Sequence, residues 1–141
     1  MTTPASKDDS PAPAGVPFDP LKFPKDLLDA QLLAATLYGQ LHTLQKKLSW
    51  SREPHEGWAE EPDRKREGRP ATEGWPPAEA SAYDTLWTDL REATAAVQSY
   101  TWWDRCETEG IKGVALVAAR MALKHADGAV PLQQTDIEAA A

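Results

Sequence analysis

The sequence predicts an all-α fold: a three-helix bundle built on a long antiparallel helical hairpin, with a long loop that contains Trp and Pro. Two segments, residues 24–48 and 79–104, carry apolar side chains at alternating steps of three and four, which is the spacing of a helix that packs along one side against another helix. Residues 49–78 between them are rich in Pro and Gly and are therefore expected to form the loop. We find no strand pair or Gly-rich phosphate loop in the pattern.

The chain of 141 residues is long enough for one domain, which we expect at residues 21–128. Residues 1–20 are rich in Pro, Ala, Ser and Asp, so they bury too little apolar surface to offset their ordering entropy. We expect them to be a disordered tail. Residues 129–141 are expected to be a flexible acidic tail.

The first helix is expected over residues 24–48. Pro24 suits a first helical turn, and the negative charge of Asp26 suits a helix amino end. Gly39 costs about 1 kcal/mol relative to Ala inside a helix. The apolar spacing continues past it, so the helix is expected to run through. The residues of this seam are Leu27, Ala30, Ala34, Leu37, Leu41, Leu44 and Leu48.

The loop at residues 49–78 contains two similar phrases, "PHEGW" at residues 54–58 and "PATEGW" at residues 70–75. In each, the glycine can take the positive φ of a tight turn, and the tryptophan can fold back as an anchor. The charge-dense centre of the loop, "EEPDRKREGR", is expected to be solvated and mobile.

The second helix is expected over residues 79–104 and to begin near Pro77 or Ser81, because Ser81 and Asp84 have the spacing of a capping box. If this helix continues unbroken past Tyr100, Trp103 lies on its core side and Trp102 on its outer side, since neighbouring residues differ by about 100°. Its seam consists of Tyr83, Leu86, Leu90, Ala93, Val97 and Tyr100.

The third helix is expected over residues 109–126, with Thr108 as amino cap and Gly128 as the stop. Its basic residues Lys112, Arg120 and Lys124 occupy one narrow side. Apolar residues fill the remaining arc, which predicts a helix buried between neighbours.

The formal net charge of −7 opposes general attraction to nucleic-acid phosphates and anionic membranes. No apolar run approaches the roughly 20 residues that cross a bilayer, and the first residues lack the basic-then-apolar pattern of a secretion signal. We therefore expect a cytoplasmic protein without a membrane partner.

The sequence gives little indication of catalysis. A single cysteine, Cys106, excludes an internal disulfide and a cysteine-rich zinc site. The three histidines, His42, His55 and His125, lack the spacing of metal ligands, and no serine lies in a nucleophile motif. We expect no catalytic residue, cofactor or metal.

Five tryptophans are the candidate interface or pocket residues: Trp50, Trp58, Trp75, Trp102 and Trp103. The first hypothesis is a non-enzymatic protein that binds a protein partner or forms a homodimer through them. Each tryptophan has a structural alternative, as a core residue or as an anchor of the loop. The second hypothesis is a small-molecule binder or enzyme with a Trp-lined pocket. A third is an acidic mimic of nucleic acid, which the division of acidic residues among loop, tails and second helix opposes.

Overall fold

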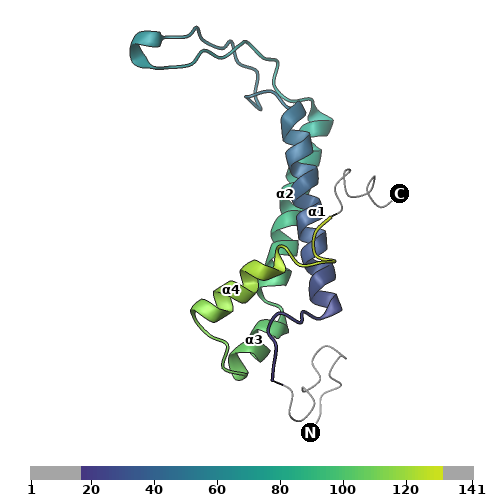
Figure 1. Cartoon of the computed structure of the whole chain (residues 1–141). Helices are drawn as coiled ribbons and strands as arrows, with labels where there is room; N and C mark the ends of the chain where they lie inside the picture. The colour runs from purple at the N-terminus through teal and green to yellow at the C-terminus, as the bar shows by residue number, and fades with distance from the viewer. Residues whose placement is uncertain (1–16, 132–141) are drawn as a thin grey trace, which may run out of the picture. The chain divides into compact units, whose positions relative to one another are not determined.

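The computed structural model describes residues 17–131, which form four α-helices and one turn of 3-10 helix. In chain order these are α1 (Lys25–Lys47), the 3-10 turn η2 (Pro62–Arg64), α2 (Pro77–Gln98), α3 (Thr101–Thr108) and α4 (Val114–Leu123) (Figure 1). Residues 17–131 contain isolated backbone bridges but no regular strand. The predicted all-α class is confirmed. Of the tails predicted for residues 1–20 and 129–141, residues 1–16 and 132–141 lie outside the described residues.

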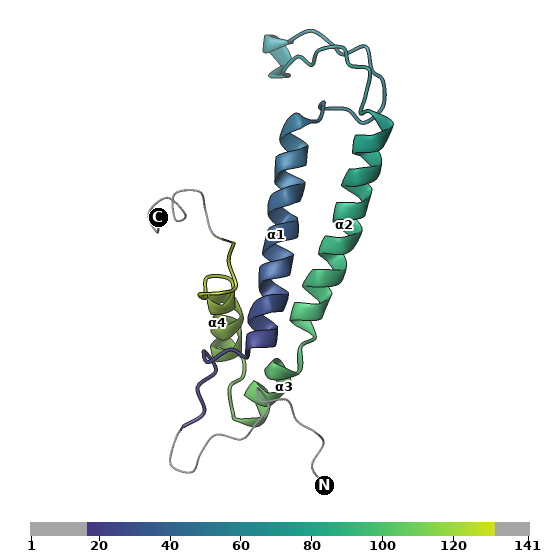
Figure 2. The same cartoon turned by 90° about the vertical axis from the view of Figure 1, so that its right-hand side faces the viewer.

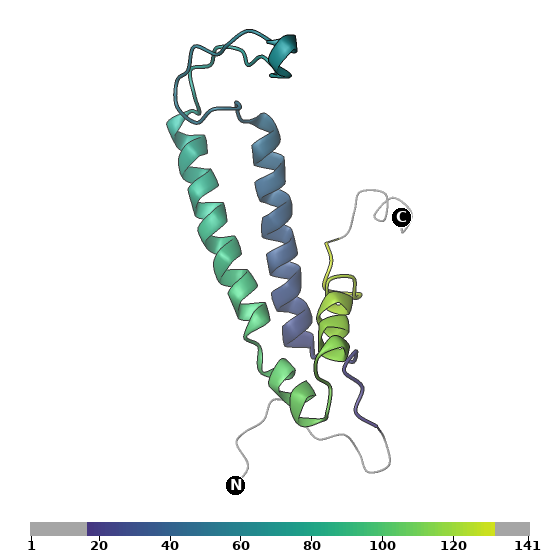
Figure 3. The same ribbon diagram turned by 90° about the vertical axis from the view of Figure 1, so that its left-hand side faces the viewer.

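The chain divides into two compact units. Within the described residues, the core unit comprises 17–37 and 90–131, and the loop unit comprises 38–89. Both α1 and α2 contribute a stretch to each unit. In each unit the two stretches lie side by side and run in opposite directions, as Figures 2 and 3 show, which is the predicted helical hairpin.

The first helix follows the sequence closely. The backbone N–H groups of Leu27 and Leu28 both donate to the Pro24 carbonyl, at 3.1 and 3.0 Å, so Pro24 lies at the start of α1. The helix runs through Gly39 without a break, as predicted. Three of the predicted seam residues, Leu27, Ala34 and Leu41, are buried.

The start of α2 differs from the predicted cap. The helix begins at Pro77, whose fixed φ suits a first turn, so Ser81 lies inside the helix and the predicted capping box with Asp84 is wrong. Asp84 instead binds Arg52 of the loop. The predicted seam is confirmed in the core unit, where Leu90, Ala93 and Val97 are buried.

The segment predicted as one helix over residues 79–104 is two helices. The chain is extended at Tyr100, with φ −63° and ψ 141°, so α2 ends at Gln98 and α3 begins at Thr101. Side chains from later helices satisfy carbonyl groups at the end of α2. The indole N–H of Trp103 donates to the Val97 carbonyl at 2.7 Å, and Arg120 donates to the Gln98 carbonyl at 3.3 Å. These bonds replace the ladder bonds that a continued helix would make.

The third predicted helix is shorter than residues 109–126. Thr108 ends α3 and donates its hydroxyl to the Asp104 carbonyl, so the prediction of Thr108 as an amino cap is wrong. Gly110 and Gly113 both have positive φ, 89° and 56°, and α4 starts only at Val114. Gly128 turns the chain with φ 84°. Ala129 beyond it is fully buried, so the core extends past the predicted boundary at residue 128.

Candidate functional site

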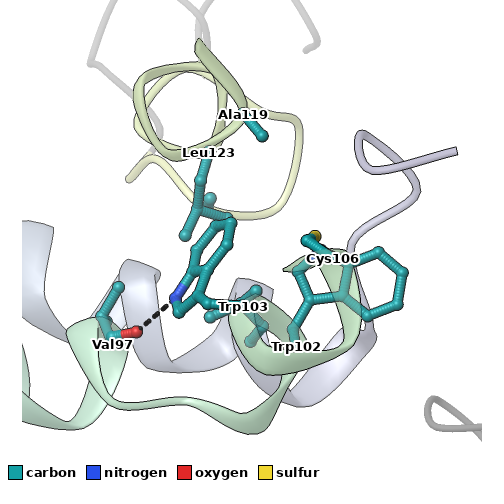
Figure 4. Packing of buried hydrophobic residues seen from close by; sticks show 8 residues of the cluster. Val97, Trp102, Trp103, Cys106, Ala119 and Leu123 are labelled. Atoms are coloured by element: carbon teal, nitrogen blue, oxygen red, sulfur yellow. Dashed lines mark hydrogen bonds between the residues drawn. The ribbon is translucent and has the colours of Figure 1, made fainter. Parts of the chain in front are cut away.

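Trp103 lies in the buried cluster of the core unit, which joins side chains from all four helices and the segments that flank them (Figure 4). Only 3% of Trp103 is exposed. Besides its bond to Val97, its ring is covered by the guanidinium of Arg120, 4.7 Å from the ring centroid, and meets Phe23 edge-on at 6.3 Å. The buried members of the cluster are Leu27, Val97, Trp102, Trp103, Cys106, Ala119, Leu123 and Ala129.

Trp102 is also buried, with 5% of its surface exposed. Its outward position was expected only for an unbroken helix, and the break at Tyr100 turns both tryptophans inward. Phe18 packs against its ring with centroids 5.1 Å apart, and its indole N–H donates to the Pro20 carbonyl at 3.2 Å. Residues 18 and 20, which we predicted to be part of a disordered tail, therefore cover Trp102. Its aromatic surface contributes to packing of the core unit.

Cys106 is fully buried beside the two tryptophans. Burial raises the pKa of its thiol, although the positive charges of Arg105 and Arg120 act in the opposite direction. A thiolate is the reactive form of cysteine, so the raised pKa and the lack of access both make this residue inert. Cys106 is a packing residue of the core.

The loop unit contains an antiparallel pairing of the loop with itself. His55 exchanges both backbone hydrogen bonds with Thr72, at 2.9 and 2.8 Å, and Trp58 does so with Arg69, both at 2.9 Å. A further pair, Glu61 with Arg66, encloses the turn η2 at the centre of the loop. We call residues 52–75 the paired loop. Its charged centre, expected to be solvated, has exposed side chains around a defined turn.

The two Glu-Gly-Trp phrases belong to a longer repeat, Arg-x-x-x-Glu-Gly-Trp, at residues 52–58 and 69–75. Gly57 and Gly74 have positive φ, 77° and 84°, as the sequence indicated. The backbone N–H of each tryptophan donates to the carbonyl of the arginine in the other copy, Trp58 to Arg69 and Trp75 to Arg52, both at 2.9 Å. Each copy thus holds the other. The arginine that begins both phrases was the sequence signal for this pairing.

In each copy of the repeat, the side chain two residues before the glycine accepts the glycine N–H. His55 Nδ1 accepts from Gly57 at 2.8 Å, and Thr72 Oγ1 accepts from Gly74 at 3.1 Å. These bonds fix the turn that brings each tryptophan back to the opposite copy. His55 therefore has a structural role in the loop, which its sequence context did not indicate.

The three loop tryptophans are half-buried anchors, and each indole N–H donates to a distant backbone carbonyl. The acceptors are Pro70 for Trp50, Glu67 for Trp58 and Ser49 for Trp75, at 2.8, 2.7 and 2.8 Å. These bonds join the two sides of the loop. These are the contacts of loop anchors, the structural alternative expected from the sequence for these tryptophans.

The aromatic rings of the loop unit form two groups. Trp50, His55 and Trp58 contact one another in a triangle, with ring centroids 4.9, 5.2 and 5.7 Å apart, whereas Trp75 packs against Tyr83 of α2 at 4.8 Å. Such separations are contact distances for edge-to-face rings, so no ligand fits between them. The structure does not bring the five candidate tryptophans together: Trp50 and Trp58 share one group, Trp75 belongs to another, and Trp102 and Trp103 lie in the core unit.

Arg52 joins the paired loop to α2. Its guanidinium makes two hydrogen bonds to the carboxylate of Asp84, at 2.7 and 2.8 Å, and also lies over the Trp75 ring at 5.4 Å. The hydrogen bonds from Arg52 lower the pKa of Asp84 below its ordinary value. This fork geometry gives the loop a defined attachment to the helix.

We expect the attachment to weaken in acid. Because the pKa of Asp84 is lowered in the folded protein, its contribution to stability is present above the ordinary carboxyl pKa of about 3.9 and is lost as the pH falls through the folded value. NMR titration should place the Asp84 midpoint below that of a free aspartate. Arg52→Gln should move it back up. Arg69→Gln, at the equivalent position of the second repeat, should leave it unchanged, and an equal effect of both variants would contradict the assignment.

The described residues of the core unit leave an apolar surface on α4 exposed. Val114, Val117 and Met121 of α4 expose 87%, 59% and 51% of their surfaces, and their spacing of three and four places them on one side of the helix. We call these three residues the α4 face. Ala119 and Leu123 on the opposite side are buried. Within residues 17–131 only one side of this helix has a neighbour, so the prediction of a helix buried between neighbours is wrong for this part of the chain.

Sequence reasoning did not single out the α4 face. An apolar arc on a helix indicates that something covers it, but the sequence does not say how much of the arc the chain itself covers. Within residues 17–131, no three His, Cys, Asp or Glu side chains gather as ligands for a metal ion. In the same stretch, no helix combines the length and apolar character needed to cross a membrane.

A helical hairpin with a reciprocally paired loop and one uncovered apolar helix face defines a small all-α domain. The chain belongs to the family described as a domain of unknown function, DUF8825, whose model matches residues 26–126. That range includes both repeats of the paired loop and the whole of α4. No curated protein and no solved structure matches the chain.

Proposed function

We propose that this is a non-enzymatic protein that acts by binding another protein chain through the α4 face. One observation carries the proposal: three of the large apolar residues that the structure leaves exposed lie within eight residues on one side of one helix. Scattered exposed apolar residues are ordinary on soluble proteins, whereas a contiguous apolar surface is typical of an interaction site.

The spacing of the α4 face supports recognition of a partner by a helix. Anchors at positions i, i+3 and i+7 are the pattern by which an amphipathic helix contacts an apolar groove or a second helix. The neighbouring Ala115 and Ala118 are small and exposed, which allows another backbone to approach closely.

The core tryptophans support this function as positioning residues. Trp103 receives the guanidinium of Arg120 from α4, and Leu123 of α4 packs into the same cluster. These contacts hold the buried side of α4, so its opposite side is presented on a fixed element. A cytoplasmic setting belongs to the proposal and is supported by the single unpaired thiol, which is typical of reducing compartments.

Site-specific photocrosslinking in the native cells tests the proposed function. A benzophenone amino acid in place of Val117 should give a covalent adduct with a protein, because a docked partner lies within reach of this side chain. The matched control is the same substitution at Glu92, which is exposed on α2 in the core unit. Met121→Glu should abolish the Val117 adduct while the helical circular dichroism stays unchanged. Absence of an adduct from Val114, Val117 and Met121 alike would overturn the proposal.

A further inference from the structure

We infer that the occupant of the α4 face is a second copy of this chain, which contributes the acidic outer side of its α1. This inference rests on the proposed function, because it names the partner of the same surface. We call Asp26, Asp29 and Leu33 the α1 face. All three are exposed, with 53% of Leu33 open to solvent, and they follow the same steps of three and four as the α4 face.

The surroundings of the α4 face are basic in an otherwise acidic chain. Residues 111–125 include Lys112, Arg120 and Lys124 and contain no Asp or Glu, although the whole chain has a net charge of −7. Arg120 is engaged by Trp103 and by the Gln98 carbonyl. Lys112 and Lys124 are exposed at the two ends of α4, and neither has an ion pair within the described part of the chain.

These charges disfavour pairing of α4 with α4 of another copy. An antiparallel pair would bring Lys124 of one helix near Lys112 of the other, and a parallel pair would bring identical lysines together. Like charges across an interface oppose association. The surface that covers the α4 face must therefore combine apolar and acidic side chains.

The α1 face has this combination in a matching register. Leu33 lies seven residues after Asp26 on α1, and Lys124, the carboxyl cap of α4, lies seven residues after Val117. If the two helices meet antiparallel with Leu33 opposite Val117, Asp26 comes opposite Lys124. Asp29 then lies opposite Met121, with its charge already balanced by Lys25 at 2.8 Å.

Two copies related by a twofold axis would make this contact twice, since each copy supplies one α4 face and one α1 face. Such isologous contacts are the commonest form of homodimer interface. The lysines and aspartates set the orientation, and the apolar residues of both faces leave water together.

Sedimentation equilibrium of the purified full chain tests the inference. The wild-type protein should change from monomer to dimer with concentration. Val117→Glu and Leu33→Glu should each leave a monomer with unchanged circular dichroism. Lys124→Glu should weaken dimerisation about tenfold, and adding Asp26→Lys should restore most of the loss, because the exchanged charges attract again. Lys47→Glu, at an exposed lysine outside both faces, changes the net charge by the same amount as Lys124→Glu and should leave dimerisation unchanged.

Other outcomes overturn either the second copy as the partner or the α1 face as its contact surface. A chain that stays monomeric at all concentrations would do so, as would binding of the monomer to anionic phospholipid vesicles through α4. A dimer lost in Val117→Glu but kept in Leu33→Glu would overturn the α1 face while leaving docking at α4 intact. Likewise, a Val117 crosslink to a protein of another mass would support the proposed function and reject the second copy.

Discussion

Replacing Trp103 by alanine is expected to lower the free energy of unfolding by about 3–5 kcal/mol, the cost of removing a buried aromatic side chain. The change leaves a cavity between Leu123 and Val97, removes the ring beneath Arg120, and leaves the Val97 carbonyl without its indole donor. Since small domains are stable by only about 5–15 kcal/mol, this single change could unfold the core unit. Urea denaturation followed by circular dichroism measures the loss.

Trp103→Phe is the matched variant for this prediction. It keeps an aromatic ring in the cluster but removes the N–H that binds Val97, so we expect a loss clearly smaller than that of the alanine variant. If alanine at this position cost less than about 1 kcal/mol, the side chain would not have the packing role that its 3% exposure indicates.

Gly57→Ala and Gly74→Ala are each expected to open the paired loop. Both glycines have positive φ, and a Cβ at Gly57 would collide with the Arg69 carbonyl, while one at Gly74 would collide with the Arg52 carbonyl. The obstacles are backbone atoms of the opposite copy, so no side chain can move aside to relieve them. Hydrogen exchange should show loss of protection at Trp58, Arg69 and Thr72, whose N–H groups donate across the loop.

Substitutions at two other glycines separate the effect of backbone strain from that of a collision. Gly39 lies in α1 with open space around it, so Gly39→Ala should stabilise the protein by up to about 1 kcal/mol through helix propensity. Gly110 has φ 89° but no neighbour within 4 Å. Gly110→Ala should therefore lower the free energy of unfolding through backbone strain alone, without a collision. A loop that stays protected in Gly57→Ala would mean that the close approach of the two copies is not required for pairing.

The long helices could be predicted because their pattern is local. Leu27, Ala34 and Leu41 repeat at helical spacing, and their burial follows from that repeat. The break at Tyr100 has no such signal, since neither Pro nor Gly lies there. The groups that bind the carbonyls at the end of α2 are the indole of Trp103 and the side chain of Arg120, which belong to α3 and α4.

In the candidate site, too, features set by neighbouring residues could be predicted, whereas contacts between distant residues could not. The positive φ of Gly57 and Gly74 follows from the Glu-Gly-Trp phrases themselves, and we could predict it. The pairing of His55 with Thr72 joins residues 17 positions apart and depends on both copies of the repeat. The α4 face was missed for a different reason: Val114 and Leu123 are both apolar in the sequence, and only the packed structure shows which of them has a neighbour.

The register of the paired loop limits how its length can change. Its bonded pairs, His55 with Thr72, Trp58 with Arg69 and Glu61 with Arg66, follow at three-residue intervals on both sides. An insertion of one residue on one side would shift every pair between that point and the tip, so an insertion between His55 and Trp58 would separate the Trp58 N–H from the Arg69 carbonyl. Insertions and deletions in relatives should therefore fall at residues 62–65. Elsewhere in the loop, a change of three residues on one side should be matched by the same change on the other side.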